Sequence, residues 1–569
     1  MENLENLNSI LPFLPIILQQ FSPCPSLSWP NQIIEALKSL SKGPDHSRVE
    51  SGEVLFLAIS DLRNSIGLSS FEINSFAEQG YSLFFDEITQ LVRLMSRVES
   101  KKWFGEVVPA LATLLLNLPG LLEEHYKNAE EISHGRKQGY PRINTGLRLL
   151  RSQESGIVVL SQELIAALLA CSFFCLFPTF DRGAKHLPDI NFDHLFAGLH
   201  PSYKQNQEHK IRCLIHYFER ISSCMPIHCV SFERKVIPSE SRPFCVSYPE
   251  ADFWSKSTIS LCHLEVLTSG LIEQQTREAL EVDFANKYIG GGAIGRGCVQ
   301  EEIRFMINPE LIVGMFFLPC MDDNEAIEIV GVERFSNYTG YGSTFRFSGD
   351  YLDEKLIDCM GRRKTRIIAI DALYRPGMRQ YRVKYLLRDI NKAWCGFFDQ
   401  IKYQNYQKAL QEDEFCRDRL HCDNQASSNK PSTCGGLHGG GEEAHVIGNC
   451  REEQSNQDLE VQDDIGIATG NWGCGAFGGD PEMKAITQWL AASQALRPFI
   501  SYYTFGEKPL QSFEQVSRWI LSHGWTVGEL WNMLVEYSTQ RVNGEIHIGF
   551  FSWLLPLLPP PLELSVVST

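Results

Sequence analysis

A strand-like segment leads directly into a glycine-rich loop in Leu280-Glu-Val-Asp-Phe-Ala-Asn-Lys-Tyr-Ile-Gly-Gly-Gly-Ala-Ile-Gly-Arg-Gly-Cys-Val-Gln-Glu-Glu-Ile-Arg-Phe305. The short run 280–285, rich in strand-forming residues, is typical of a β-strand. Helical residues resume at Gln300 and continue to Ile307, where Asn308-Pro309 ends the helix. A strand, a glycine loop and a helix in this order favour an α/β fold whose loop approaches a ligand closely.

Strand-like and helical patterns alternate through the remainder of the second half of the chain. We expect strands at 229–236, 326–335, 365–372, 466–472 and 499–505, and helices at 300–307, 381–401 and 481–496. Alternation of this kind builds a sheet with helices on both faces. Capping signals mark three helix starts: Asp480 before Pro481, Ser512 with Gln515, and Thr526 with Glu529.

Composition places the chain among folded globular proteins. It has 569 residues, of which 43% are hydrophobic and 21% charged, and this excludes collagen-like and wholly disordered classes. The net charge of −17 argues against a protein that binds nucleic acid through a general basic surface. Seventeen cysteines without a framework spacing fit a reducing compartment, so we expect no disulfides.

The chain divides into three parts by pattern. Residues 1–226 are predicted to form a mainly α-helical accessory domain, with helical periodicity at 82–124, 161–177 and 208–224. Residues 227–548 are predicted to form the α/β domain, and 549–569 a C-terminal tail. The apolar run 10–18 follows Glu2 and Glu5 rather than basic residues, so secretion is not expected. The apolar run 548–558 is too short to span a membrane, and we expect no membrane association.

A polar segment at 416–464 interrupts the α/β domain. It is rich in Gly, Asn, Ser and acidic residues, and its composition predicts a disordered insertion. Potential zinc ligands lie within it: Cys416, His421, Cys422, Cys434, His438, His445 and Cys450. They form no CxxC or HxxxH pair, which disfavours a zinc site, so we expect no metal.

The triplet Gly290-Gly291-Gly292 and the adjacent Glu301 and Glu302 carry the first chemical signal. Consecutive glycines let the backbone approach a ligand, and their N–H groups are candidates to hold anionic oxygens. Paired carboxylates at a helix start often serve only the helix dipole. Neighbours on a helix differ in direction by about 100°, so one carboxylate can transfer protons while the other holds a hydroxyl.

The glycine elements also fit two alternative interpretations. Gly290, Gly292 and Gly295 also satisfy GxGxxG, but in a dinucleotide-binding turn the helix begins inside that pattern, whereas here it resumes only at Gln300, which disfavours an NAD site. Cys474 is a candidate nucleophile, yet no partner histidine lies in any of these motifs.

A second glycine element, Thr469-Gly-Asn-Trp-Gly-Cys-Gly-Ala-Phe-Gly-Gly-Asp480, also lies between a predicted strand and a predicted helix. Such a position makes an anion site, although tight turns alone would also use glycine. Two such elements in one sheet indicate a diphosphate ligand. Tyrosines at 337–342 and aromatic residues at 502–506 are candidates to stack on a purine, with packing in the core as the alternative.

These motifs together resemble the poly(ADP-ribose) glycohydrolase family. The match comprises the glycine triplet, seven residues (293–299) and Gln300-Glu-Glu302, with further likeness at 282–286, 338–341 and 470–480, and it runs in order from about residue 160 to 537. The loop 293–299 differs in detail from other members, and the insertion 416–464 lies outside the family pattern. The resemblance implies a macrodomain-like three-layer α/β/α core with a mixed sheet, preceded by the helical accessory domain.

The resemblance also implies roles for single residues. Glu302 is the expected general acid/base, Glu301 positions a ribose hydroxyl, and Asp283 supports the catalytic loop. The expected substrate-binding residues are Ile272, Glu273, Asn286, Gly290, Gly291, Gly292, Gln300, Tyr341, Asn471, Trp472, Gly473, Cys474, Gly475, Ala476, Phe477 and Phe505.

The implied activity is hydrolysis of the ribose–ribose bonds of poly(ADP-ribose) on modified proteins, with ADP-ribose as product. No cofactor and no direct nucleic-acid binding are expected, and the protein is expected to be a monomer of the nucleus and cytoplasm. A non-catalytic ADP-ribose reader is the alternative from another class, and hydrolysis of the ester that joins the first unit to a protein also stays open. The basic run 362–366 is either a nuclear import signal or a solvated strand entry.

Overall fold

A mixed sheet of eight strands forms the centre of the molecule, in the order β3-β4-β7-β10-β6-β11-β12-β5. The computed structural model describes residues 2–19, 26–68, 76–86, 94–134, 144–179, 182–183, 186–200, 204–238, 247–400, 402–404, 406 and 465–555. The strands are β3 (Gly156–Ser161), β4 (Cys229–Val236), β5 (His263–Leu267), β6 (Ala279–Asp283), β7 (Glu325–Gly331), β10 (Arg363–Ala369), β11 (Gly466–Gly470) and β12 (Phe499–Tyr503). Two-stranded pairs are formed by β1 (Ile17–Gln19) with β2 (Ser26–Ser28) and by β8 (Ser336–Thr339) with β9 (Arg346–Asp350).

The sheet is antiparallel on one side and parallel on the other. Strands β3, β4, β7 and β10 pair antiparallel, whereas β10, β6, β11, β12 and β5 pair parallel. The register sets Ala369 opposite Asp283, and Gly470 opposite Tyr503. Parallel strands bring their carboxyl ends to one edge, so the loops that leave β6, β11 and β12 meet there.

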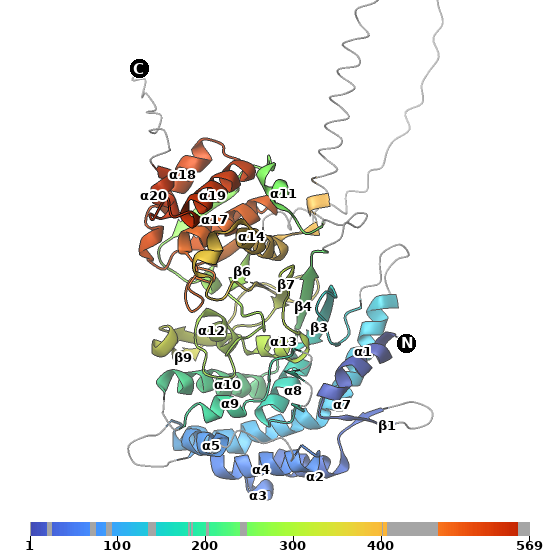
Figure 1. Cartoon of the computed structure of the whole chain (residues 1–569). Helices are drawn as coiled ribbons and strands as arrows, with labels where there is room; N and C mark the ends of the chain where they lie inside the picture. Colours follow the sequence, from blue (N-terminus) through green and yellow to red (C-terminus); the bar gives the residue numbers. More distant parts are fainter. Residues whose placement is uncertain are drawn as a thin grey trace, which may run out of the picture.

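Helices cover both faces of the sheet (Figure 1). Along β10 and the residue after it, Ile367 and Ala369 enter the core shared with the helical domain, whereas Ile368 and Ile370 enter the opposite core. This alternation is the period of a strand buried on both faces. The first face packs against α12 (Gln300–Ile307), η5 (Pro309–Val313) and α13 (Gly314–Phe317). The second packs against α11 (Ala251–Ser255), α14 (Val383–Phe397), α17 (Pro481–Gln494), α18 (Phe513–Ser522), α19 (Val527–Val542) and α20 (Phe550–Leu554). The predicted three-layer α/β/α core is confirmed.

The first part of the chain is mainly helical, as predicted. Its helices are α1 (Glu2–Ile10), α2 (Asn31–Ser41), α3 (Pro44–Ser47), α4 (Gly52–Ser65), α5 (Ala77–Phe85), α6 (Arg97–Lys102), α7 (Val108–His134), α8 (Gln162–Phe173), α9 (Asp193–Ala197) and α10 (Gln205–Ser223). Strand β3 also comes from this part and pairs with β4, so the two predicted domains share the sheet. The helical run Arg97–Ala129 is long and apolar enough to span a membrane by length and composition alone. Leu111, Leu115 and Leu118 of this run are buried, which is the position of a core helix.

The structure confirms two of the predicted helix caps and differs from two other local predictions. Asp480 caps α17 and Thr526 with Glu529 forms a capping box, but the hydroxyl of Ser512 makes no cap bond. The segment predicted as a tail includes α20, whose Phe550 and Leu554 are buried. The insertion 416–464 and its zinc-ligand candidates lie outside the described residues.

The basic run 362–366 lies at the start of β10. Arg362 pairs with Asp358, Arg363 pairs with Glu333, and Lys364 and Arg366 both pair with Glu278. Because carboxylates already balance these charges, the run fits a strand entry better than an exposed import signal.

Candidate active site

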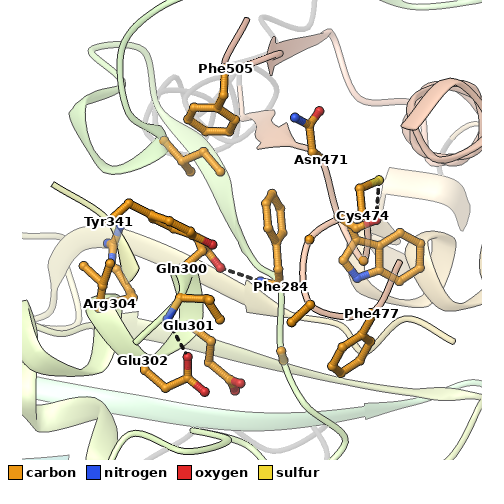
Figure 2. A pocket seen from close by; sticks show the side chains of 18 of the residues that line it. Phe284, Gln300, Glu301, Glu302, Arg304, Tyr341, Asn471, Cys474, Phe477 and Phe505 are labelled. Carbon is orange, nitrogen blue, oxygen red and sulfur yellow. Dashed lines mark hydrogen bonds between the residues drawn. The ribbon is translucent and has the colours of Figure 1, made fainter. Parts of the chain in front are cut away.

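A pocket of about 700 Å³ opens at the carboxyl ends of the parallel strands. Side chains reach it from α12, from the loop after β11, and from the loops that carry Tyr341 and Phe505 (Figure 2). Its lining residues are Leu271, Ile272, Glu273, Phe284, Ala285, Asn286, Val299, Gln300, Glu301, Glu302, Ile303, Arg304, Tyr338, Gly340, Tyr341, Ala372, Asn471, Trp472, Gly473, Cys474, Gly475, Ala476, Phe477, Pro481, Phe505, Glu507 and Pro509. The structure thus joins motifs that are about 170 residues apart in the sequence.

Backbone N–H groups hold both glutamates at the first turn of α12. The carboxylate of Glu301 accepts hydrogen bonds from the N–H of Gly290 (2.6 Å) and of Asn286 (2.9 Å). The carboxylate of Glu302 accepts from the N–H of Gly292 (2.9 Å) and of Val299 (2.8 Å). A Cβ atom placed on Gly291 would lie 2.6 Å from Glu301 Oε2 and 2.9 Å from Glu302 Oε1. The two carboxylates therefore flank Gly291 closely, and only a residue without a side chain fits between them.

This arrangement corrects the expectation that the amides of the triplet hold anionic oxygens of a ligand. The N–H groups of Gly290 and Gly292 donate to the two glutamates, and that of Gly291 donates to the carbonyl of Tyr288. Within the part of the chain that the structure describes, the N–H groups of Gly475, Ala476 and Phe477 have no partner, and these residues line the pocket. Of the two glycine loops, it is accordingly the second that keeps open N–H groups at the main pocket.

The triplet itself lies at the margin of the main pocket. Gly290 is buried against Phe305 and Met315, while Gly291 and Gly292 line a second, neighbouring pocket of about 420 Å³. None of the three glycines lines the main pocket. Asn286 lines both pockets, so the loop 286–292 forms the wall between them.

Burial and like charge raise the pKa values of two carboxyl groups beneath the pocket. The pKa of Asp283 is raised to about 7, because burial disfavours its charge and Glu302 repels it, although Arg304 acts in the opposite direction. Burial, followed by Asp283 and Glu302, raises the pKa of Glu301 well above its ordinary value. Neither oxygen of Asp283 has a hydrogen-bond partner among the described residues. Burial therefore favours the protonated form of both Asp283 and Glu301.

We expect Asp283→Asn to change how stability depends on pH. The folded wild type binds a proton at Asp283 between about pH 4 and 7 that the unfolded chain has released, so its stability falls as the pH rises through this range. The variant lacks this loss. The unfolding temperature of the variant relative to wild type should therefore rise between pH 4.5 and 7.5, as measured by thermal unfolding at several pH values. A constant difference across this range would contradict the shift.

Among the other predicted ligand-binding residues that line the pocket, some side chains are held by hydrogen bonds and others are exposed. Gln300 is fixed by bonds from the N–H of Phe284 (2.8 Å) and to the carbonyl of Val282 (3.1 Å). The hydroxyl of Tyr338 donates to Glu273 (2.5 Å), next to the buried Ile272. Tyr341 and Phe505 are 56% and 45% exposed, which leaves both rings available to a ligand.

The second glycine loop is anchored from below. The indole of Trp472 donates to the carbonyl of Ile370 (2.9 Å) and is fully buried, so this residue supports the loop from the core. The amide of Asn471 donates to the carbonyl of Thr504 (3.0 Å). Burial raises the pKa of Cys474 to about 12, which keeps its thiol protonated and argues against a nucleophilic role.

Comparison with known proteins decides the family. Residues 251–512 match the family model described as the macro domain fold of poly(ADP-ribose) glycohydrolase, and residues 95–234 match the model of its helical domain. Over 98% of both chains, this chain is 56% identical to poly(ADP-ribose) glycohydrolase 1 of Arabidopsis thaliana. The chain belongs to the poly(ADP-ribose) glycohydrolase family. The resemblance inferred from the motifs is thereby confirmed.

Other members of the glycohydrolase family match over different lengths. Probable poly(ADP-ribose) glycohydrolase 2 of Arabidopsis thaliana is 50% identical over 98% of this chain and 100% of its own length. Poly(ADP-ribose) glycohydrolase 1 of Caenorhabditis elegans is 28% identical over 75% of this chain and 48% of its own length. The likeness to the plant glycohydrolases therefore extends across both parts of the chain.

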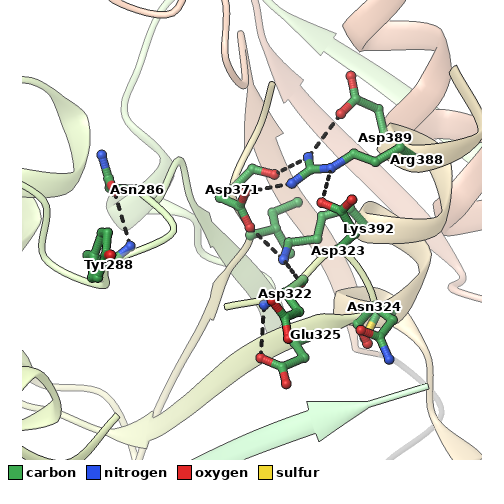
Figure 3. A network of polar contacts seen from close by, with 12 residues as sticks. Asn286, Tyr288, Asp322, Asp323, Asn324, Glu325, Asp371, Arg388, Asp389 and Lys392 are labelled. Atoms are coloured by element: carbon green, nitrogen blue, oxygen red, sulfur yellow. Dashed lines mark hydrogen bonds and ion pairs between the residues drawn. The ribbon is translucent and has the colours of Figure 1, made fainter. Parts of the chain in front are cut away.

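A buried ion network supports the strand ends of the glycohydrolase core (Figure 3). Arg388 on α14 binds Asp371 at 2.6 Å, Asp323 at 2.7 Å and Asp389 at 3.1 Å. Lys392 binds the second oxygen of Asp371 at 2.5 Å. The network continues to Lys484 on α17, which pairs with Asp389 and lies 4.4 Å from the ring of Trp472. Charged groups in this network are mutually paired, so they fix the base of the second glycine loop.

The motifs did not single out Lys210 of α10. Its ammonium group is buried and donates to the carbonyls of Gly292 (3.2 Å), Gly295 (2.8 Å) and Gly297 (2.5 Å). On the same face of α10, Gln207 donates to the carbonyl of Gly295 (3.0 Å) and Asn206 to that of Gly342 (3.1 Å). The helical domain of this family member therefore holds both the glycine loop and the loop of Tyr341.

We expect Lys210→Met to lower kcat/KM by about 10- to 100-fold, because three carbonyls lose their charged donor and the loop that positions both glutamates shifts. Lys204→Met is the matched control, since Lys204 is exposed at the start of the same helix. Steady-state assays with polymer, together with circular dichroism to verify folding, measure the effect. Equal activity of the two folded variants would contradict the role of Lys210.

Asp189, Asp193 and His194 are the described residues grouped closely enough to hold a metal ion, with ligand atoms within 4.8 Å of one another. Asp189 and His194 line the second pocket rather than the main one. Partly exposed acidic groups of this kind are common without an ion, so we assign no metal to the glycohydrolase site.

Proposed function

We propose that this chain hydrolyses the ribose–ribose O-glycosidic bonds of poly(ADP-ribose) and releases ADP-ribose, with Glu302 as general acid/base. The observation that carries this proposal is the placement of Glu301 and Glu302 beside Gly291, at the wall of a pocket that also receives the second glycine loop. Membership of the glycohydrolase family supports the substrate class.

The reaction requires proton transfer at two stages. Cleavage of a glycosidic bond passes through an oxocarbenium-like state and needs a proton on the leaving oxygen. Glu302 supplies this proton, and its carboxylate then accepts a proton from the attacking water. The bonds from the N–H of Gly292 and Val299 fix the direction of the carboxyl group, so little reorganisation is needed during the reaction.

Glu301 and Asp283 act around this centre. Because its pKa is raised, Glu301 is suited to stay protonated and to donate a hydrogen bond to a ribose oxygen. This bond positions the sugar beside Glu302. Asp283 lies beneath the loop and couples electrostatically to both glutamates. We assign it to support of the loop, since it does not line the pocket.

The diphosphate of the bound unit is assigned to the second glycine loop. The open N–H groups of Gly475, Ala476 and Phe477 offer fixed donors without a positive side chain. We assign Tyr341, which lines the same pocket, to stacking over the nucleotide, and Phe477 and Phe505 to the pocket of the terminal ribose. This division of roles suits an acidic protein that binds an anion locally.

The test is incubation of the purified chain with poly(ADP-ribose), followed by chromatography of the products. Release of free ADP-ribose is expected. Polymer binding without any release would indicate a non-catalytic reader instead. A substrate that retains one unit on a protein tests the ester alternative, and we expect that unit to persist.

Location in the nucleus and cytoplasm and a monomeric state remain part of the proposal. Both rest on the family resemblance rather than on any signal in the described residues. Fluorescent tagging at each terminus in turn and analytical ultracentrifugation test them.

A further inference from the structure

A basic segment lies next to the pocket residue Phe477 and runs from the residues after β10 into the first turn of α14. We name it the basic rim and define it as residues 374–384, Tyr-Arg-Pro-Gly-Met-Arg-Gln-Tyr-Arg-Val-Lys. It carries Arg375, Arg379, Arg382 and Lys384, all exposed, and no acidic residue. Among the described residues, none of these four side chains forms an ion pair. Such a concentration of uncompensated positive charge is unexpected in a chain of net charge −17.

The basic rim is attached to the second glycine loop. The ring of Tyr374 packs against that of Phe477, with centroids 5.3 Å apart and planes at 90°. The N–H of Arg375 donates to the carbonyl of Phe477 (3.0 Å). At the other end of the loop, the hydroxyl of Tyr381 donates to Asp480 (2.6 Å). The rim therefore begins where the pocket wall formed by Phe477 ends.

The backbone of the basic rim is held in a sharp turn. Arg375 has φ of 45° and Gly377 has φ of 50°, both in the left-handed region. A residue with a side chain rarely adopts this conformation, so the surrounding contacts must stabilise it. The turn leaves the guanidinium of Arg375 5.2 Å from the ring centre of Tyr374, which is 58% exposed. An exposed aromatic ring beside a guanidinium is the usual platform for a stacked base on a single-stranded polyanion.

The pocket has room for about one nucleotide-sized ligand, because cavities of such ligands measure about 300–1,000 Å³. We propose that the basic rim binds the ADP-ribose units that lie next to the unit in the pocket, with Arg375, Arg382 and Lys384 on phosphates and Tyr374 stacked on an adenine. The proposal rests on the proposed function, because it concerns further units of the same polymer. Arg379 has a different role, since it donates to the carbonyls of Pro376 and Arg375 and stabilises the turn.

The test compares two triple variants. In the rim variant Arg375, Arg382 and Lys384 are replaced by Ala. In the control variant Lys42, Lys101 and Lys102, exposed on the helical domain, are replaced by Ala, so the net charge changes equally. We expect the rim variant to raise KM for long polymer about 10-fold, with kcat and the Kd of free ADP-ribose within about twofold of wild type. No increase, or an equal increase in the control variant, would overturn the proposal.

Salt dependence gives a second measure. Each lost phosphate contact should reduce the slope of log Kd against log salt concentration by about 0.7, so three contacts reduce it by about 2. Binding of long polymer is measured with both triple variants in the Glu302→Gln background, so that cleavage does not interfere. This binding measurement tests the basic rim independently of cleavage. If the wild type releases no ADP-ribose, that result refutes the proposed function but not the proposal for the rim.

Competition distinguishes the polymer from other polyanions. Single-stranded DNA of matched charge should inhibit polymer binding at least 10-fold more weakly than unlabelled polymer does. Tyr374→Leu should weaken polymer binding about three- to tenfold through lost stacking. If DNA competes as strongly as polymer and the rim variant loses both equally, the segment is a general nucleic-acid site and the proposal fails.

Discussion

Replacement of Glu302 by Gln is expected to lower kcat on poly(ADP-ribose) by about 100-fold or more. General acid/base groups typically contribute 10²- to 10⁴-fold, and an amide neither delivers nor accepts the required proton. The amide oxygen still accepts one of the two N–H bonds from Gly292 and Val299, so the loop should keep its shape. The affinity for ADP-ribose should change little. Initial rates and calorimetric titration with ADP-ribose measure the two quantities.

Glu507→Gln is the matched control for Glu302→Gln. Glu507 also lines the pocket, but it is exposed, and none of the N–H groups that hold Glu302 bonds to it. Its variant should retain kcat within about twofold. If Glu302→Gln cleaves polymer at an undiminished rate, the assignment of the acid/base is wrong, whatever the result for Glu507.

Replacement of Gly291 by Ala should lower kcat/KM by about 100-fold or more. Gly291 has φ of 49°, and an added Cβ would lie 2.6 Å from an oxygen of Glu301 and 2.9 Å from one of Glu302. No Cβ atom fits at such distances, so both carboxyl groups or the loop must move. A displacement of about 1 Å at reacting groups is enough for an effect of this size.

Gly295→Ala tests whether this effect is specific to the position. Gly295 belongs to the same loop, but a Cβ there meets only the carbonyl oxygen of Gly292 at 3.6 Å, an ordinary contact. Its variant should stay within about threefold of wild type in kcat/KM and in unfolding temperature. Similar losses in both variants would show that the whole loop, rather than the space between the two glutamates, limits the rate.

Local patterns predicted the helix start that carries Glu301 and Glu302. Helix α12 begins at Gln300, as predicted. The contacts of Glu301 with Asn286 and Gly290 join residues within 15 positions of one another, so they depend mainly on one strand, one loop and one helix start. The same local reasoning failed for the hydroxyl of Ser512, which has capping-box spacing but makes no cap bond. Spacing indicates a possible hydrogen bond, whereas the final geometry depends on how the helix packs.

Longer-range features were beyond local patterns. The sequence predicted amides at the triplet as ligand donors, but Glu301 and Glu302 use two of them, and this depends on side-chain rotamers in the folded loop. Lys210 lies 82 residues before Gly292 and carries no motif, so only the packing of α10 against α12 and the β8–β9 pair reveals its contacts.

The amino-acid order by itself determined the alternation of strands and helices, the glycine triplet at its fixed distance from Gln300-Glu301-Glu302, and hence the family. These features depend on backbone preferences and on neighbours within a few turns of chain. Tertiary structure alone decided which amides remain open, which helix of the accessory domain supports the loop, and where the basic rim meets Phe477. Those contacts join segments up to about 100 residues apart, and their geometry is set only when the parallel strands align and both faces of the sheet are covered.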